Sequence, residues 1–141
     1  MNRVEDMPGV ESAVTIDQPW ASITLEGPRR FHNVESRPPE DLVGQRVAIY
    51  AAVKPDLEAA DQAIHLLDCL GVTKVERLAW KTRMVMGAII GTARVVRIVS
   101  ESPNPWFVGP FALELVDTVV LPTPRPIRAR SRAPIWKINA E

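Results

Sequence analysis

The sequence predicts a single α+β domain: a small mixed β-barrel of five to six strands with two main helices. Three observations lead to this prediction. The length of 141 residues suits one domain. Short segments rich in Val and Ile, typical of strands, are spread along the whole chain. These segments do not alternate regularly with helical ones, as the strands of an open parallel sheet would. Residues 1–12 are interpreted as an N-terminal extension and residues 13–141 as the domain.

The composition excludes several classes of protein. Hydrophobic residues make up 46% and charged residues 24%, which are ordinary globular values and exclude a disordered or fibrous chain. The single cysteine excludes an internal disulfide framework and a cysteine-only zinc site, and it fits a reducing compartment. The chain has no apolar stretch of about 18 residues, and residues 1–12 lack the apolar core of a signal peptide. We therefore expect a cytoplasmic protein without membrane contact.

The first half of the chain predicts three strands and one helix. The strands are expected at residues 14–16, 31–35 and 46–52, the last being a strongly apolar run. Asp17 is expected to cap a helix whose first turn contains Pro19. This helix should end at Gly27, because the following Pro28 makes its continuation unfavourable.

Residues 55–70 predict the clearest helix. Its expected buried face recurs at the helical period, and it consists of Leu57, Ala60, Ile64 and Leu67, flanked by Ala63 and Leu70. Gly71 is expected to end it. Asp61, His65 and Asp68 share the polar face at a spacing that suits a divalent metal, but a solvated face is the favoured interpretation because no second ligand cluster accompanies them. Neither a metal nor a cofactor is predicted.

The second half predicts a long strand, two further strands and a basic loop. Residues 84–99 form the long strand, which Gly87 and Gly91 should allow to bend. Further strands are expected at 113–121 and 135–138. The segment 122–137 contains five cations and no acid, namely Arg125, Arg128, Arg130, Arg132 and Lys137. It is interpreted either as a footprint for phosphate groups or, with equal weight, as a solvated loop.

Three segments taken together resemble a known family. They are Thr-Ile-Asp-Gln-Pro-Trp-Ala-Ser at 15–22, Val-Glu-Ser-Arg at 34–37 and Val-Ala-Ile-Tyr-Ala-Ala at 47–52. In order and spacing they are similar to ASCH-type domains of the PUA-like superfamily, which open with a strand, Gln-Pro-Trp-Ala and a helix. A glycine-containing strand at 87–96, a loop with Trp106 and a final Trp136-Lys137 are also similar. The resemblance spans about residues 14–138.

The resemblance implies a PUA-like barrel that binds RNA or single-stranded nucleic acid, with a nucleoside-like small molecule as the alternative partner. One base, including a modified base, would enter a cleft between the first helix and the barrel. The family's Gly-x-Lys-x-x-Glu-x-Arg element is altered here, because Glu35 lies eight positions after Gly27 instead of five. Arg29 or Arg30 then replaces the lysine, or His32 does so if the Glu-x-Arg end is the fixed point. Glu35 occupies the threonine position of members that hydrolyse acylated cytidine, so we expect no such hydrolysis.

The candidate ligand-binding residues follow from these patterns. They are Gln18, Trp20, Arg29, Arg30, Glu35, Arg37, Lys54, Trp106, Arg125, Arg128 and Arg130. The two tryptophans would stack on a base, although packing of the barrel is an alternative for both. Residues 35 and 37 of one strand point to the same side, so Glu35 and Arg37 are expected to share a pocket with Trp20. A structural salt bridge between those two is the alternative.

Two other functions remain open from the sequence. One is a small nucleoside amidohydrolase or nuclease in which Glu35 acts as general base. The other is a protein-interaction module. The sequence leaves the oligomeric state undetermined.

Overall fold

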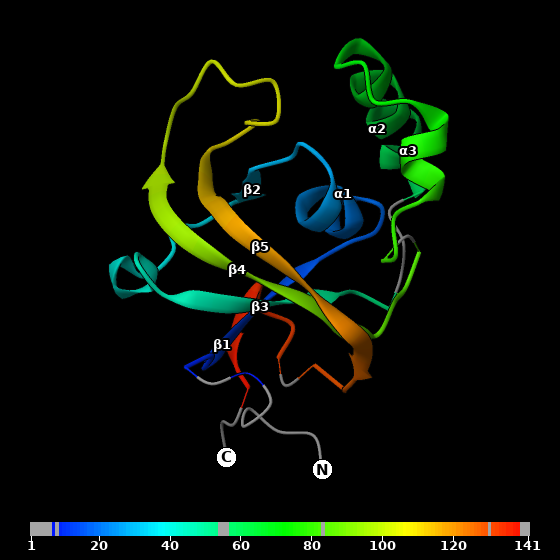
Figure 1. Cartoon of the computed structure of the whole chain (residues 1–141). Coiled ribbons are helices and arrows are strands. Elements are labelled where there is room, and N and C mark those ends of the chain that lie inside the picture. Colours follow the sequence, from blue (N-terminus) through cyan, green and yellow to red (C-terminus); the bar gives the residue numbers. More distant parts are fainter. Residues whose placement is uncertain (1–6, 8, 54–56, 83, 130, 139–141) are drawn as a thin grey trace.

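A curled six-stranded sheet, with strand order β2-β5-β4-β3-β1-β6, forms the body of the protein in the computed structural model (Figure 1). The strands are β1 (Ser12–Ile16), β2 (Phe31–Val34), β3 (Arg46–Ala51), β4 (Ala88–Val99), β5 (Phe111–Pro126) and β6 (Ile135–Lys137). The helices are α1 (Trp20–Glu26), α2 (Leu57–Cys69) and α3 (Lys74–Leu78), with a 3-10 turn, η2, at Glu40–Leu42. The structure describes residues 7, 9–53, 57–82, 84–129 and 131–138. The predicted class, an α+β fold with a small mixed barrel of five to six strands and two main helices, is confirmed as a barrel-like fold, in which the six strands form a curled half-barrel.

The sheet curls because its long central strands bend around α1. β1 and β3 are parallel, and the other neighbours are antiparallel. The register of β4 against β5 shifts at several points. One shift lies at Gly91, where a Cβ atom would collide with the carbonyl oxygen of Val119 and lie 2.7 Å from the Leu25 side chain. Glycine at this position therefore lets β5 and α1 approach the bend closely.

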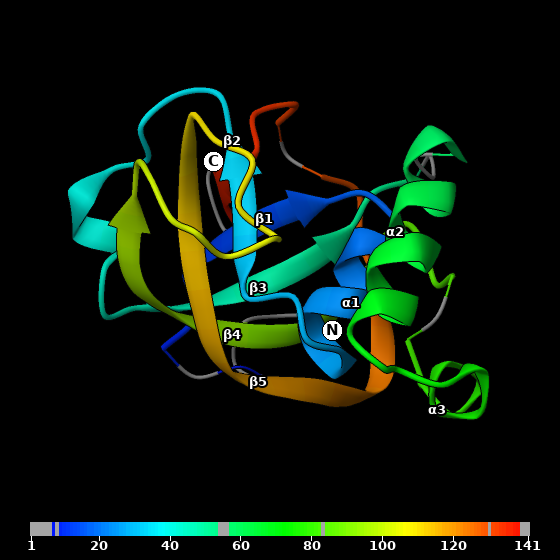
Figure 2. The same cartoon turned by 90° about the horizontal axis from the view of Figure 1, so that it is seen from above.

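The main core fills the concave side of the sheet, where α1 lies (Figures 1 and 2). Ala21 and Leu25 of α1 pack there against buried residues of β1, β3, β4 and β5, among them Val14, Ile49 and Ile90. A second cluster joins Ile23 of α1 to residues that α2, β2, β5 and the β4–β5 loop contribute: Ala63, Leu67, Phe31, Ala112 and Trp106. α1 is thus enclosed between the sheet and α2 (Figure 2). None of the helices within the described ranges is long and apolar enough to cross a membrane.

The predicted start of α1 is wrong in one detail. Asp17 is not the N-cap, because the helix begins at Trp20 and its capping position is Pro19, without a side-chain cap. The backbone N–H of Ser22 donates instead to the side-chain oxygen of Gln18. A longer side chain, one position later, has replaced the expected aspartate. Gly27 ends the helix as predicted.

The helical region after β3 differs from the prediction in two ways. α2 runs through Leu57–Cys69, but Ile64 is 50% exposed, whereas Ala63 and Leu67 are buried. The buried face is thus rotated from the predicted one toward Ala63. The segment after Gly71, to which the sequence assigned no element, contains α3. Thr73 and Glu76 stabilise its start as a capping box, a polar signal that the apolar periodicity does not show.

The predicted basic loop begins later than expected, because β5 continues to Pro126. Prolines at 122, 124 and 126 alternate, so their missing N–H groups fall on the same side of the strand. β5 pairs with β2 only as far as Glu114, and it forms an edge of the sheet beyond that point. An edge strand tolerates proline because no ladder hydrogen bond is lost on the open side.

Gln18 connects α1 to the segment that follows α3. The side chain is completely buried, and its Nε2 donates to the carbonyl oxygens of Thr82 (3.1 Å) and Val85 (2.7 Å). Its Oε1 accepts from the backbone N–H of Ser22 (3.1 Å) and from the Ser22 hydroxyl (3.0 Å). Both N–H donors and both acceptor positions of the amide are thereby used within the protein. Gln18 was predicted to contact a ligand, but in the structure its side chain stabilises the fold.

We expect Gln18→Met to destabilise the protein by about 3 kcal/mol, because several buried polar groups lose their partner at once. Urea unfolding followed by circular dichroism measures this change. Gln45→Met is the matched control, since the Gln45 amide makes an exposed hydrogen bond to the carbonyl oxygen of Asp41. The control should cost less than about 0.5 kcal/mol. Equal effects of the two substitutions would contradict the assigned role of Gln18.

Candidate functional site

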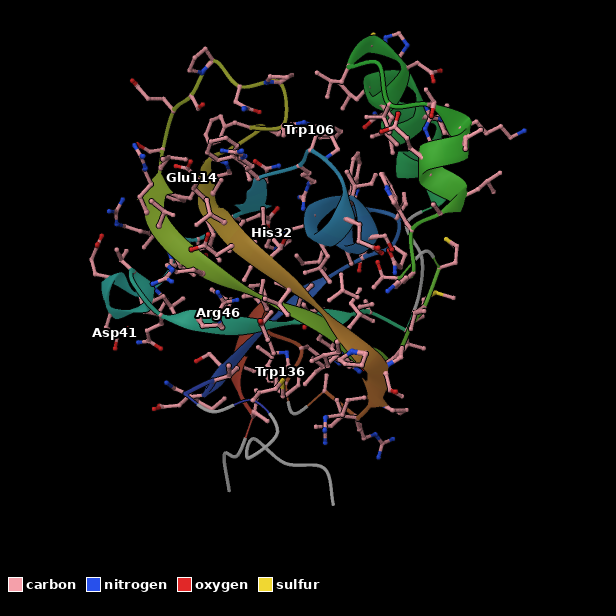
Figure 3. The ribbon with its side chains drawn as sticks, in the orientation of Figure 1. His32, Asp41, Arg46, Trp106, Glu114 and Trp136 are labelled. Atoms are coloured by element: carbon pink, nitrogen blue, oxygen red, sulfur yellow. The ribbon has the colours of Figure 1, made fainter. Side chains whose placement is uncertain are left out.

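A cavity of about 350 Å³ lies where the start of α1, β2, α2 and the β4–β5 loop meet. Figure 3 shows two of its residues, with His32 on β2 and Trp106 on the loop. The lining consists of Thr15, Ile16, Asp17, Trp20, Arg29, His32, Asn33, Gln62, Leu66, Pro105, Trp106 and Val108. Aromatic, cationic and polar side chains therefore meet in one recess.

Arg29 places a buried positive charge in this cavity. Its side chain is 6% exposed, and the guanidinium carbon lies 5.4 Å from the centre of the Trp20 ring. Nη1 donates to the hydroxyl of Thr24 (2.7 Å), which itself donates to the carbonyl oxygen of Trp20 (2.8 Å). Burial lowers the pKa of Arg29 from its ordinary value to about 9, so the group is still a cation at neutral pH. Among the described residues, no carboxylate forms an ion pair with it.

His32 is held neutral beside this cation. Its Nδ1 lies 3.4 Å from Nη2 of Arg29, and a guanidinium has only donors, so Nδ1 is the accepting nitrogen. The proton of the neutral ring is thereby assigned to Nε2. Burial, and secondly the charge of Arg29, lower the pKa of His32 from 6.5 to about 3. The ring therefore acts as a neutral N–H donor over the physiological pH range.

Asn33 fixes the loop that carries Trp106. Its Nδ2 donates to the carbonyl oxygen of Trp106 (3.0 Å), and its Oδ1 accepts from the backbone N–H groups of Val108 (2.7 Å) and Gly109 (3.1 Å). Within the loop, the N–H of Trp106 donates to Oδ1 of Asn104 (2.9 Å). The buried Trp106 ring meets Trp20 edge to face, with centroids 6.1 Å apart. Asn33 of β2 therefore holds in place the loop whose Trp106 packs against Trp20.

The structure brings together three of the predicted ligand residues, Trp20, Arg29 and Trp106. The predicted convergence of Glu35 and Arg37 with Trp20 is wrong. β2 ends at Val34, so strand alternation does not orient the residues beyond it. Glu35 is exposed, and neither residue lines the cavity. Arg37 pairs with Glu40 (2.6 Å) and lies over the Phe111 ring.

The remaining predicted residues lie elsewhere. Arg30 is exposed and does not line the cavity. Arg125 and Arg128 belong to the far end of β5 and the segment after it, which Figure 1 shows on the opposite side of the molecule from the β4–β5 loop. Lys54 and Arg130 are outside the described residues. The described part of the chain contains no group of three or more His, Cys, Asp or Glu side chains arranged to hold a metal ion.

Sequence reasoning missed Asn33 and Thr24, and it gave His32 only as an alternative for the family's lysine. The one available signal is the polar pair His32-Asn33 inside the otherwise apolar β2. No protein-family model matches this chain, and no curated protein matches it.

The neutral state of His32 predicts a loss of stability in acid. Unfolded His32 takes up a proton near pH 6.5, whereas the folded protein resists protonation down to about pH 3. The free energy of unfolding should therefore fall as the pH drops from about 6.5 toward 3. Nitrogen-15 imidazole spectra of His65→Gln, which retains only one histidine, measure the titration directly. Protonation of His32 near pH 6 would contradict the buried site, and His32→Gln should flatten the pH dependence of unfolding.

Proposed function

We propose that the protein binds RNA or another single-stranded nucleic acid and takes one base, modified bases included, into the cavity. The observation that carries this proposal is the buried cation of Arg29, which lies over Trp20 and has no carboxylate partner among the described residues. Burying a charge without a counter-charge is costly. An anionic or oxygen-rich ligand that contacts Arg29 offsets this cost.

The size of the cavity favours a single nucleotide unit. Its volume of about 350 Å³ is at the lower end of the range of about 300–1,000 Å³ that is typical of small-molecule sites. A duplex does not enter such a recess, whereas a base that is already unpaired enters it at low energetic cost. Single strands are therefore the favoured substrate class.

The lining groups have distinct roles in this proposal. Trp20 and Trp106 supply apolar walls against which a planar base packs. Arg29 donates to a phosphate or carbonyl oxygen, and Nε2–H of His32 donates to a second acceptor. The Oδ1 of Asn33 and one N–H of its Nδ2 hold the loop, which leaves the second N–H of this lining residue as a further donor. The site therefore selects ligands that present acceptors.

No observation favours the alternative of a nuclease or an amidohydrolase. That alternative needs Glu35 in contact with the ligand, and Glu35 lies outside the cavity. Asp17 is a carboxylate in the lining, but it already makes another interaction. We therefore propose binding without a chemical step.

Arg29→Gln should weaken binding of a short fluorescein-labelled single-stranded RNA at least tenfold, which corresponds to about 1.4 kcal/mol. Fluorescence anisotropy measures the dissociation constant. Arg37→Gln is the matched control, because Arg37 is an exposed arginine outside the cavity. A thermal melt verifies that both variants remain folded. Equal affinities of Arg29→Gln and wild type would refute the assignment of the cavity.

The basic segment at residues 122–137 predicts that the salt dependence of binding changes with the length of the nucleic acid. Arg128 is exposed and belongs to the segment after β5, which lies on the opposite side of the molecule from the β4–β5 loop (Figure 1). We therefore expect that a nucleic-acid strand of a few nucleotides does not contact both Arg128 and the cavity that this loop lines. For a nucleic acid long enough to contact both the cavity and Arg128, Arg128→Ala should reduce the slope of log K against log salt concentration by about 0.7. For the short strand the slope should not change. An equal reduction of the slope for the short and the long nucleic acid would contradict this prediction. It would show that binding at Arg128 does not require a nucleic acid that also reaches the cavity.

A further inference from the structure

Exposed apolar side chains are concentrated in one part of the chain. Of the ten large hydrophobic residues that are exposed within the described ranges, six lie between residues 64 and 86. They are Ile64, Leu70, Val75, Leu78, Met84 and Met86, with exposed fractions from 38% to 76%. Isolated exposed hydrophobics are ordinary, whereas a contiguous group marks an interaction site.

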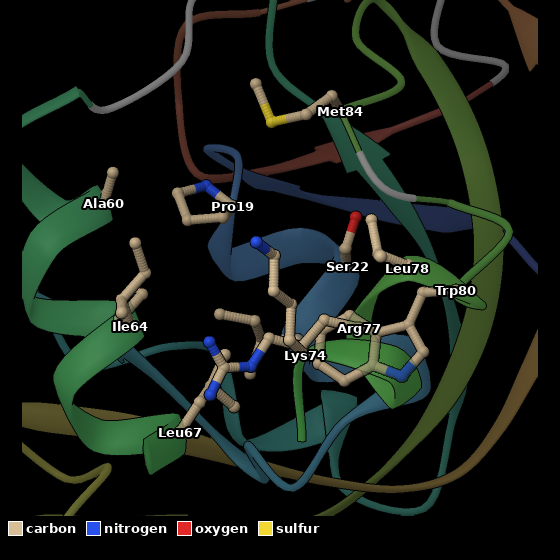
Figure 4. A pocket seen from close by; sticks show the side chains of 12 residues that line it. Pro19, Ser22, Ala60, Ile64, Leu67, Lys74, Arg77, Leu78, Trp80 and Met84 are labelled. Atoms are coloured by element: carbon tan, nitrogen blue, oxygen red, sulfur yellow. The ribbon is translucent and has the colours of Figure 1, made fainter. Parts of the chain in front are cut away.

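Three of these residues border a single groove. Ile64, Leu78 and Met84 line a recess of about 240 Å³ that α1, α2 and α3 enclose (Figure 4). Its other walls include Ile23 of α1 and Ala63 of α2. α3 buries none of its residues, although a complete capping box stabilises its start. A well-formed helix thus presents an uncovered apolar side.

The groove is held open by fixed contacts. The carbonyl oxygen of Thr82 accepts from the Ser22 hydroxyl (2.6 Å), and the N–H of Thr82 donates to the Glu26 carboxylate (2.7 Å). Trp80 packs so closely on the end of α1 that a Cβ at Gly27 would lie 2.8 Å from its ring. These contacts anchor the segment after α3 to α1, so the groove does not close by collapse of that segment.

The charges of the two helices are complementary. α2 contains acids and no Lys or Arg, and Asp61, Ile64, His65 and Asp68 form an exposed stripe along it. Two cations of α3, Lys74 and Arg77, border the groove, and among the described residues no acid does so. Arg77 forms an ion pair with Asp68 of α2 in the same chain, so Lys74 and Asp61 are the charges that the two helices offer to a partner. Glu76 is the acid of α3, and its carboxylate is used in the capping box. The groove therefore fits an occupant that is apolar and acidic, which is the character of the α2 stripe itself.

We propose that this face binds a second copy of the chain in a two-fold dimer, with α2 of each protomer against α3 and the groove of its partner. A two-fold interface uses the same patch on both subunits and must be self-complementary, as an acidic and a basic helix beside a shared apolar groove are. A stable interface buries about 1,200–2,000 Å² in total. A small ligand in the groove would leave Val75, which is 76% exposed, uncovered.

This surface is separate from the candidate nucleic-acid cavity. Gln62 and Leu66 of α2 line the cavity, whereas Ala60 and Ile64 line the groove. The two recesses thus lie on different sides of one helix. The proposed dimer does not rest on the proposed function, and its test uses no nucleic acid.

Sedimentation velocity and light scattering of the full chain test the proposal. We expect a species of twice 15.7 kDa that dissociates on dilution. Ile64→Asp should weaken the dimer at least a hundredfold, because it places a charge at the centre of the apolar face. Val119→Asp is the matched control, since Val119 is 51% exposed on β5 and Ile64 is 50% exposed. Circular dichroism shows that both variants are folded.

A charge exchange tests the pairing of the helices. Asp61→Lys and Lys74→Glu should each weaken the dimer, and the two substitutions in one chain should restore it. A wild type that is monomeric at every concentration would overturn the proposal, and so would a dimer that survives Ile64→Asp. A double variant weaker than both single variants would overturn the pairing of α2 with α3.

Discussion

The buried amide of Gln18 is the constraint on which the cavity and the groove depend. It fixes the start of α1 to the carbonyl oxygens of Thr82 and Val85, far along the chain. α1 carries Trp20 toward the cavity and Ile23 toward the groove. An amide without solvent contact is tolerated only when its donors and acceptors are all satisfied. The orientation of α1 is thereby specified by four hydrogen bonds in addition to apolar packing.

The parts of the fold that apolar burial determines were predictable from the sequence. Residues 47–51 of β3 are all buried, which agrees with their continuous apolar run in the sequence. Gly27 and Gly71 follow the ends of α1 and α2, as expected. Elements that depend on other terms were not predictable. α3 depends on a capping box rather than on buried residues. The far end of β5 contains alternating prolines, which are normally read as a loop and are tolerated here because that part of the strand is an edge.

The candidate site was predictable where its residues are neighbours in sequence. Trp20 is the first residue of α1 and Arg29 follows the end of this short helix by three residues, so their contact is local in the sequence. Asn33 acts on Trp106 and Val108 more than 70 residues later, and a single sequence gives no sign of such a contact. Glu35 and Arg37 were misplaced because their orientation depended on a strand that ends one residue before Glu35.

α2 forms a wall of two recesses at once, with Gln62 and Leu66 on one side and Ile64 on the other. A shift or rotation of this helix changes the shape of both recesses together. A ligand that binds more tightly to one position of α2 therefore alters the affinity at the other recess. By thermodynamic reciprocity the second occupant alters the first affinity by the same factor. A single helix thus gives this small fold a physical route to allosteric coupling.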